Sequence, residues 1–144
     1  MPSTHLSLHY HLIFSTKDRI GYMHKDWRER LHAYLGGIIN DLGGMGILHR
    51  FLSIEEQVQQ VQKLRELGVN PIAASIGVGE EFKSRAQKLV EAGCRVLTID
   101  IAHGHSVQMV ETMKWVKDKF SDVELIVGNV ATAEATDELI DEGA

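Results

Sequence analysis

The sequence predicts an α/β protein in which parallel strands alternate with helices. From about residue 47, short apolar runs alternate with amphipathic helical segments. Gly68 and Gly93 follow two of these segments, at positions where a chain commonly leaves a helix. Such βα repetition implies parallel strands joined by right-handed crossovers. Residues 1–44 follow a different pattern, so we divide the chain into 1–44 and 45–144.

The second part begins with clear helix and strand signals. Residues 53–68 predict a helix, because Ser53 and Glu56 have the spacing of a capping box. The apolar stripe of this helix comprises Ile54, Val58, Val61 and Leu64. Residues 71–78 are almost continuously apolar, which predicts a buried strand. Residues 80–93 predict the next helix.

The same alternation continues along the chain. Residues 94–102 and 123–129 predict strands, and residues 105–120 predict a helix. The apolar side chains of that helix are Met109, Met113, Val116 and Phe120, with Val110 alongside. Residues 132–144 start another helix, with Thr132 as its candidate N-cap.

The first part predicts a strand, a loop and a helix. In residues 4–17, apolar side chains alternate with polar ones, which indicates a half-exposed strand of an antiparallel or mixed sheet. A helix is expected from about Asp26, weakened by Gly36 and Gly37 at roughly 1 kcal/mol per glycine.

Composition limits the class of protein. The chain has 144 residues, 44% apolar and 24% charged, which suits one ordinary globular domain. No apolar run approaches the roughly 20 residues of a membrane span. The net charge of −5 gives no general attraction to nucleic acid or anionic membranes, so neither is expected as a partner. A single cysteine excludes an internal disulfide and predicts a cytoplasmic location.

A nucleic-acid-binding module is the alternative that the first part offers. Residues 17–30 are basic and contain Tyr22 and Trp27, whose rings are able to stack on bases. Binding of that kind would weaken steeply with added salt.

Two polar residues stand where successive predicted strands end. Asp100 follows a buried apolar run, and a buried carboxylate is costly unless it meets a partner or solvent. Asn129 occupies the same position at the end of the next strand. Because the carboxyl ends of parallel strands open onto the ligand crevice, these two residues predict a ligand rim. The alternative is that both cap neighbouring loops.

Histidines raise the question of a metal site. His103 and His105 lie close to Asp100, but Gly104 between them makes their spacing flexible and no further ligand pair is evident. A loop role is therefore favoured over metal binding. Gly104 itself predicts either a turn with positive φ or the close approach of a ligand.

Two other positions have ordinary structural explanations. His9 and His11 share one strand face, a spacing that can hold a divalent metal, although a solvated face is the simpler explanation. Cys94 begins a predicted strand and is expected to be a small buried apolar residue, not an activated thiolate.

Four stretches of residues 43–144 resemble, in order, the catalytic barrel shared by GMP reductase and IMP dehydrogenase. They are GGMGILHRFLSIEEQ, IAASIGV, LTIDIAHGHS and VGNVATAEATDELIDEGA. The resemblance implies a TIM-type (β/α)8 barrel that binds a purine nucleotide and a nicotinamide cofactor, NAD or NADP. A complete barrel has eight βα units in about 250 residues. The chain is therefore expected to be a partial barrel of three to four units, preceded by a strand-loop-helix segment from a different fold. Self-association is expected through the open sheet edges.

The resemblance also assigns cofactor-binding residues. The positions that fall where the family contacts its dinucleotide are Asp100, Ile101 and Ala102. Asn129 borders the nicotinamide site, and Arg50 is similar to a cofactor-side residue of the reductases. The two histidines of the loop then become part of its architecture, and no metal is implied.

The spacing of the motifs favours the GMP reductase branch. A single helix links HRF to IAASIGV, where IMP dehydrogenases usually insert regulatory modules. The stretches HGHS and GNVATAEAT are also similar to bacterial IMP dehydrogenases, which remain the alternative. The family's cysteine nucleophile lies in a loop beyond the positions that match Gly143 and Ala144, and Cys94 opens a strand at the opposite end. We therefore assign no catalytic residue and expect no hydride transfer between NADPH and GMP by the isolated chain.

Residues 3–44 resemble the start of small HUH-type transposases, which act on single-stranded DNA with a tyrosine nucleophile. The matching stretches are THLSLHYHLIFSTKDR and WRERLHAYLGGIINDLGG. In that family the metal-binding histidines come later, so His9 and His11 are not assigned to metal. The chain is expected to be a fusion of two truncated pieces that meet at Gly43 and Gly44, and a fusion without function is a further alternative.

Overall fold

The computed structural model describes residues 38–39 and 42–144, which fall within one compact unit, Ile38–Ala144. From residue 47 onward this described part alternates strands with helices. In chain order the elements are β1 (Ile47–Leu48), α2 (Ile54–Glu66), β2 (Ala73–Ile76), α3 (Phe82–Ala92), β3 (Val96–Asp100), α4 (Val107–Lys119), β4 (Glu124–Gly128) and α5 (Ala133–Asp141). The predicted α/β class is confirmed. The predicted strand at 4–17, with His9 and His11, and the basic stretch 17–30 lie outside the described residues.

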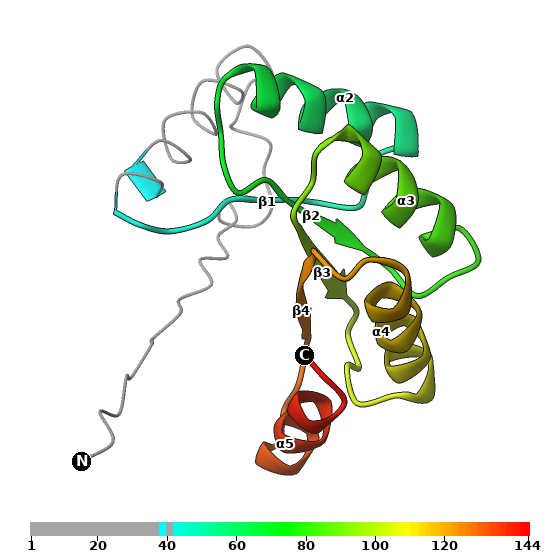
Figure 1. Ribbon diagram of the computed structural model, residues 1–144. Coiled ribbons are helices and arrows are strands. Elements are labelled where there is room, and N and C mark those ends of the chain that lie inside the picture. Colours follow the sequence, from blue (N-terminus) through cyan, green and yellow to red (C-terminus); the bar gives the residue numbers. More distant parts are fainter. Residues whose placement is uncertain (1–37, 40–41) are drawn as a thin grey trace, which may run out of the picture. The chain divides into compact units, whose positions relative to one another are not determined.

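The sheet has the strand order and direction of consecutive barrel units. Its order is β1-β2-β3-β4, and all three pairings are parallel. Ala73 pairs with Val96, and Asp100 pairs with Gly128. The helices lie along one side of the sheet (Figure 1). This arrangement is that of a partial TIM-type barrel.

Local capping explains where the helices begin. Ser53 Oγ accepts a hydrogen bond from Glu56 N at 3.1 Å, and Ser53 N donates to Glu56 Oε2 at 2.9 Å, so the predicted capping box is present. Thr132 Oγ1 accepts from Ala135 N at 3.2 Å and is the N-cap of α5, as predicted.

The third strand is shorter than the sequence predicts. It spans Val96–Asp100 instead of 94–102. Cys94 N donates to Leu89 O at 2.9 Å, so Cys94 belongs to the turn that leaves α3. The strand begins only when the chain has left this turn.

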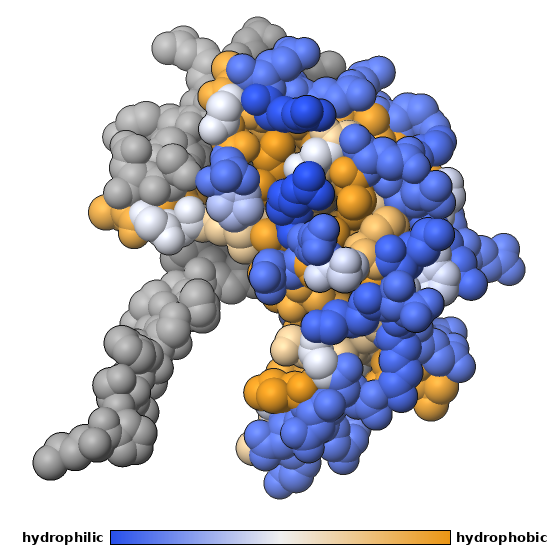
Figure 2. Space-filling model, viewed as in Figure 1, coloured by the Kyte–Doolittle hydropathy of each residue, from blue (hydrophilic) through white to orange (hydrophobic). Residues whose placement is uncertain are grey.

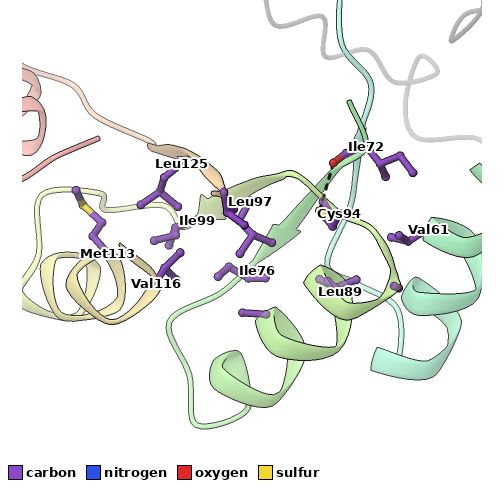
Figure 3. Close-up of a cluster of buried hydrophobic side chains, with 14 of the residues drawn as sticks. Val61, Ile72, Ile76, Leu89, Cys94, Leu97, Ile99, Met113, Val116 and Leu125 are labelled. Atoms are coloured by element: carbon purple, nitrogen blue, oxygen red, sulfur yellow. Dashed lines mark hydrogen bonds between the residues drawn. The ribbon is translucent and has the colours of Figure 1, made fainter. Parts of the chain in front are cut away.

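The core lies between the sheet and its helices (Figure 3). Leu97 and Ile99 of β3 are fully buried there, together with Met113 and Val116 of α4. Fully burying side chains of this size stabilises a fold by about 1.5–3 kcal/mol each. Because side chains alternate along a strand, Val96, Thr98 and Asp100 lie on the opposite face of β3.

Polar side chains dominate the outer surfaces of α3 and α4 (Figure 2). Among the helices that the structure describes, none is long and apolar enough to cross a membrane.

Candidate functional site

The predicted site residues come together at the carboxyl end of the sheet. Arg50 lies two positions after β1, Asp100 is the last residue of β3, and Asn129 directly follows β4. Since the strands are parallel and in register, these three positions share one edge.

Arg50 and Asp100 are joined through the main chain. Arg50 Nε donates to the carbonyl oxygen of Asp100 at 3.0 Å. Both residues are partly exposed. The Asp100 side chain lies on the face of β3 opposite Leu97 and Ile99, at the end of the strand, and Asp100 does not belong to the buried core cluster. Its carboxylate therefore lies at the rim of the sheet and outside the packed core.

The backbone ladder continues past the ends of β3 and β4. Ile101 N donates to Gly128 O at 2.8 Å, and Asn129 N donates to Ile101 O at 2.6 Å. These bonds hold Ile101 and Asn129 side by side. Ala102 and Asn129 are exposed.

Gly104 makes a close contact with this ladder. Gly104 N donates to Asn129 O at 2.8 Å. A Cβ placed on Gly104 would lie 2.7 Å from Asn129 O and 3.3 Å from the carbonyl carbon of Gly128. Its φ is not among the positive ones, so the predicted left-handed turn is absent. The close neighbour is the chain's own backbone at Asn129, where the sequence had suggested a ligand.

The two histidines of this loop are both exposed. His105 Nε2 lies 2.6 Å from Glu138 Oε2 of α5, so this side chain links the loop to the following helix. Over the described residues, no group of three or more His, Cys, Asp or Glu side chains is arranged to hold a metal ion.

A cavity of about 230 Å³ opens between the ends of β1 and β2 and the start of α3. Its lining is Arg50, Gly77, Val78, Gly79, Glu81, Phe82, Arg85 and Ile101. Phe82 packs edge-on against Trp115, with ring centroids 5.3 Å apart. Arg50 and Ile101 are thus the two predicted cofactor-binding residues that line this cavity, and the other three lie along the rim beside it.

Two buried polar side chains near the cavity escaped the sequence reasoning. Gln57 is fully buried and Arg85 is 5% exposed, although each lies on an amphipathic helix where a polar residue ordinarily faces water. Gln57 Oε1 accepts from Arg85 Nη1 at 2.8 Å. The sequence did contain a signal for their burial: Gln57 and Arg85 stand at helical spacing from apolar residues, next to Val58 and Ala86.

Cys94 is buried, as predicted (Figure 3). Its thiol lies 3.3 Å from Ile72 O and 3.1 Å from Val96 O. Burial raises the pKa of the Cys94 thiol from 9.0 to about 11. The thiolate that nucleophilic catalysis requires is therefore scarce at neutral pH.

Comparison with known proteins agrees with this architecture. The model of the IMP dehydrogenase / GMP reductase domain matches residues 33–144, starting before the predicted junction at Gly43 and Gly44. An inosine-5'-monophosphate dehydrogenase from Aquifex aeolicus (strain VF5) is 49% identical over 79 residues, which are 55% of this chain and 16% of that protein. The inosine-5'-monophosphate dehydrogenase from Staphylococcus aureus (strain Mu50 / ATCC 700699) is 51% identical over 73 residues, 51% of this chain and 15% of that protein.

These relatives carry the name of the IMP dehydrogenase branch, so the predicted preference for GMP reductase is not confirmed and both branches fit. Because the family model covers more than half of the residues, the chain belongs to the IMP dehydrogenase / GMP reductase family.

Proposed function

We propose that this chain carries a nicotinamide-dinucleotide-binding surface of a purine-nucleotide oxidoreductase. The observation that carries the proposal is the meeting of Arg50, Asp100, Ile101 and Asn129 at the carboxyl edge of one parallel sheet. Ligands of parallel α/β folds bind at this edge. Family membership supports a nicotinamide cofactor, NAD or NADP, and a purine nucleotide as substrate.

Each residue offers a group that suits part of such a ligand. The Asp100 carboxylate accepts hydrogen bonds from ribose hydroxyl groups. The Arg50 guanidinium, whose Nε is already bound to the Asp100 carbonyl, offers its remaining N–H groups to phosphate oxygens. The Asn129 side chain, which is exposed at the rim, has an amide suited to the carboxamide of nicotinamide.

Binding and turnover are separate parts of the proposal. A purine adduct needs an activated thiolate, and burial raises the pKa of Cys94, the single cysteine of the sequence. We therefore infer that the 144-residue chain binds dinucleotide but does not reduce GMP to IMP by itself. The oxidation of IMP, the reaction of the other branch, is the alternative that the names of the relatives favour.

Titration calorimetry with NADPH and NADH tests the binding surface. The variant Asp100→Ala should raise the dissociation constant about tenfold or more, because a hydrogen bond to a charged group contributes about 1.5–3 kcal/mol. Asp122→Ala is the matched control, since Asp122 is exposed and precedes β4 at the opposite end of the sheet. Equal affinities of the two variants would remove Asp100 from the site.

Three further expectations remain proposals. Within the described part, β1 and β4 each pair on one side only, which supports self-association through sheet edges. The transposase-like segment at 3–44 falls almost entirely outside the described residues. The cytoplasmic location rests on the use of a single cysteine.

A further inference from the structure

Arg85, which lines the cavity, makes a buried hydrogen bond with Gln57. Gln57, in the first half of α2, donates through Nε2 to Ser75 O at 2.9 Å and to His49 O at 3.2 Å. Its Oε1 accepts from Arg85 Nη1 at 2.8 Å. Since arginine cannot accept a hydrogen bond, this contact fixes the orientation of the amide.

Arg85 also contacts the segment between β1 and α2, three residues after His49. Its Nη1 also donates to Leu52 O at 3.0 Å. Its positive charge is balanced by Glu81, whose Oε1 accepts from Nη2 at 2.6 Å and from Nε at 3.2 Å. The guanidinium of Arg85 is thus largely occupied by the protein itself.

The two carbonyl groups held in this way flank Arg50. Gln57 binds the carbonyl of His49, and Arg85 binds that of Leu52, so the loop 49–52 is anchored on both sides of Arg50. Arg50 in turn lines the cavity and reaches the carbonyl of Asp100.

We propose that Gln57 and Arg85 are positioning residues that hold Arg50 at the cavity for an anionic ligand group. The identity of the ligand rests on the proposed function. The anchoring of Arg50 rests only on the hydrogen bonds of Gln57 and Arg85 to the loop 49–52. A preorganised cation binds without first losing conformational freedom, which is the advantage that the anchoring supplies.

The side-chain chemistry of Gln57 allows the positioning to be tested separately from packing. Gln57→Glu keeps an acceptor for Arg85 and nearly the same shape, but it loses the donor to the carbonyls of Ser75 and His49. Gln60→Glu is the matched control, because Gln60 lies on the same helix and is exposed. Arg85→Lys is a second variant, which keeps the charge but not the planar fork.

The first measurement is the exchange rate of the Arg50 Nε–H proton in nitrogen-15 NMR spectra of the full chain, with circular dichroism to verify folding. The signal is identified by its loss in Arg50→Lys. We expect Gln57→Glu to speed this exchange about tenfold or more and Gln60→Glu to leave it unchanged. If Gln57→Glu does not fold, Arg85→Lys takes its place with the same expected result. Exchange as slow as in the parent chain would overturn the positioning role, whether or not a dinucleotide binds.

The second measurement is a double-mutant cycle on NADPH affinity. We expect Gln57→Glu to weaken binding about tenfold alone and to have no further effect in an Arg50→Ala background, because it acts through Arg50. A full additional loss in that background would mean that Gln57 acts only on general stability, and the role would be rejected. If the parent chain does not bind NADPH, the proposed function fails while the exchange measurement still decides the positioning.

Discussion

Replacing Gly104 by alanine should strain the contact on which the rim of the site depends. The added Cβ would lie 2.7 Å from Asn129 O, 3.1 Å from the carbonyl carbon of Asn129 and 3.3 Å from that of Gly128. All three neighbours are backbone atoms of the last residue of β4 and of the residue after it, so no side chain can rotate away. The loop and the end of the strand have to separate, which also stretches the bond from Gly104 N to Asn129 O.

The cost follows from the geometry. Forcing an extra carbon into a packed site costs about 1–3 kcal/mol. For a chain of this size each kcal/mol lowers the melting temperature by about 3–5 °C. Thermal unfolding followed by far-ultraviolet circular dichroism measures this shift directly.

Gly79→Ala supplies the matched comparison. A Cβ at Gly79 would meet nothing within 4 Å, and its φ is not among the positive ones. We expect the free energy of unfolding of this variant to lie within about 0.5 kcal/mol of that of the parent chain. If Gly104→Ala is as stable as Gly79→Ala, the close approach between the loop and Asn129 does not exist in solution.

Two more predictions concern the interior and a helix start. Burial raises the pKa of Cys94 from 9.0 to about 11, so its reaction with a disulfide reagent at pH 8 should be about 100-fold slower in the native chain than in urea. The pKa of Cys94 is higher in the folded chain than in the unfolded chain. The contribution of this thiol to the free energy of unfolding is therefore fully present below pH 9 and is lost as the pH rises toward 11. In urea titrations at several pH values, Cys94→Ala should not show this loss. Ser53→Ala removes the N-cap of α2 and should lower the free energy of unfolding by about 0.5–2 kcal/mol in urea titrations. Ser121→Ala, in an exposed turn, should change it by less than about 0.5 kcal/mol, and equal effects of the two would contradict the capping role.

Much of the architecture was predictable because its causes are local. Ser53 and Glu56 are three positions apart, so the capping box could be recognised before any packing was known. Met109, Met113 and Val116 recur at helical spacing and are all fully buried on α4. Asp100 and Asn129 were predicted to lie near the ends of two successive strands, and the parallel sheet brings both to one edge. Their roles toward a dinucleotide stay predictions.

The rest required the tertiary structure. A polar residue on an amphipathic helix is ordinarily assigned to the surface, and Gln57 is buried because carbonyl groups of two other segments receive its amide. Whether Gly104 serves a turn or a close approach depends on Asn129, which reaches it only through the pairing of β3 with β4.

Over residues 53–144, sequence alone indicated which segments become helices and strands, since those choices depend on periodicity and on caps a few residues apart. Only the folded chain decided which polar groups face one another at the rim. The bond from Arg50 Nε to the Asp100 carbonyl joins residues 50 positions apart, and it depends on the order and register of the strands between them.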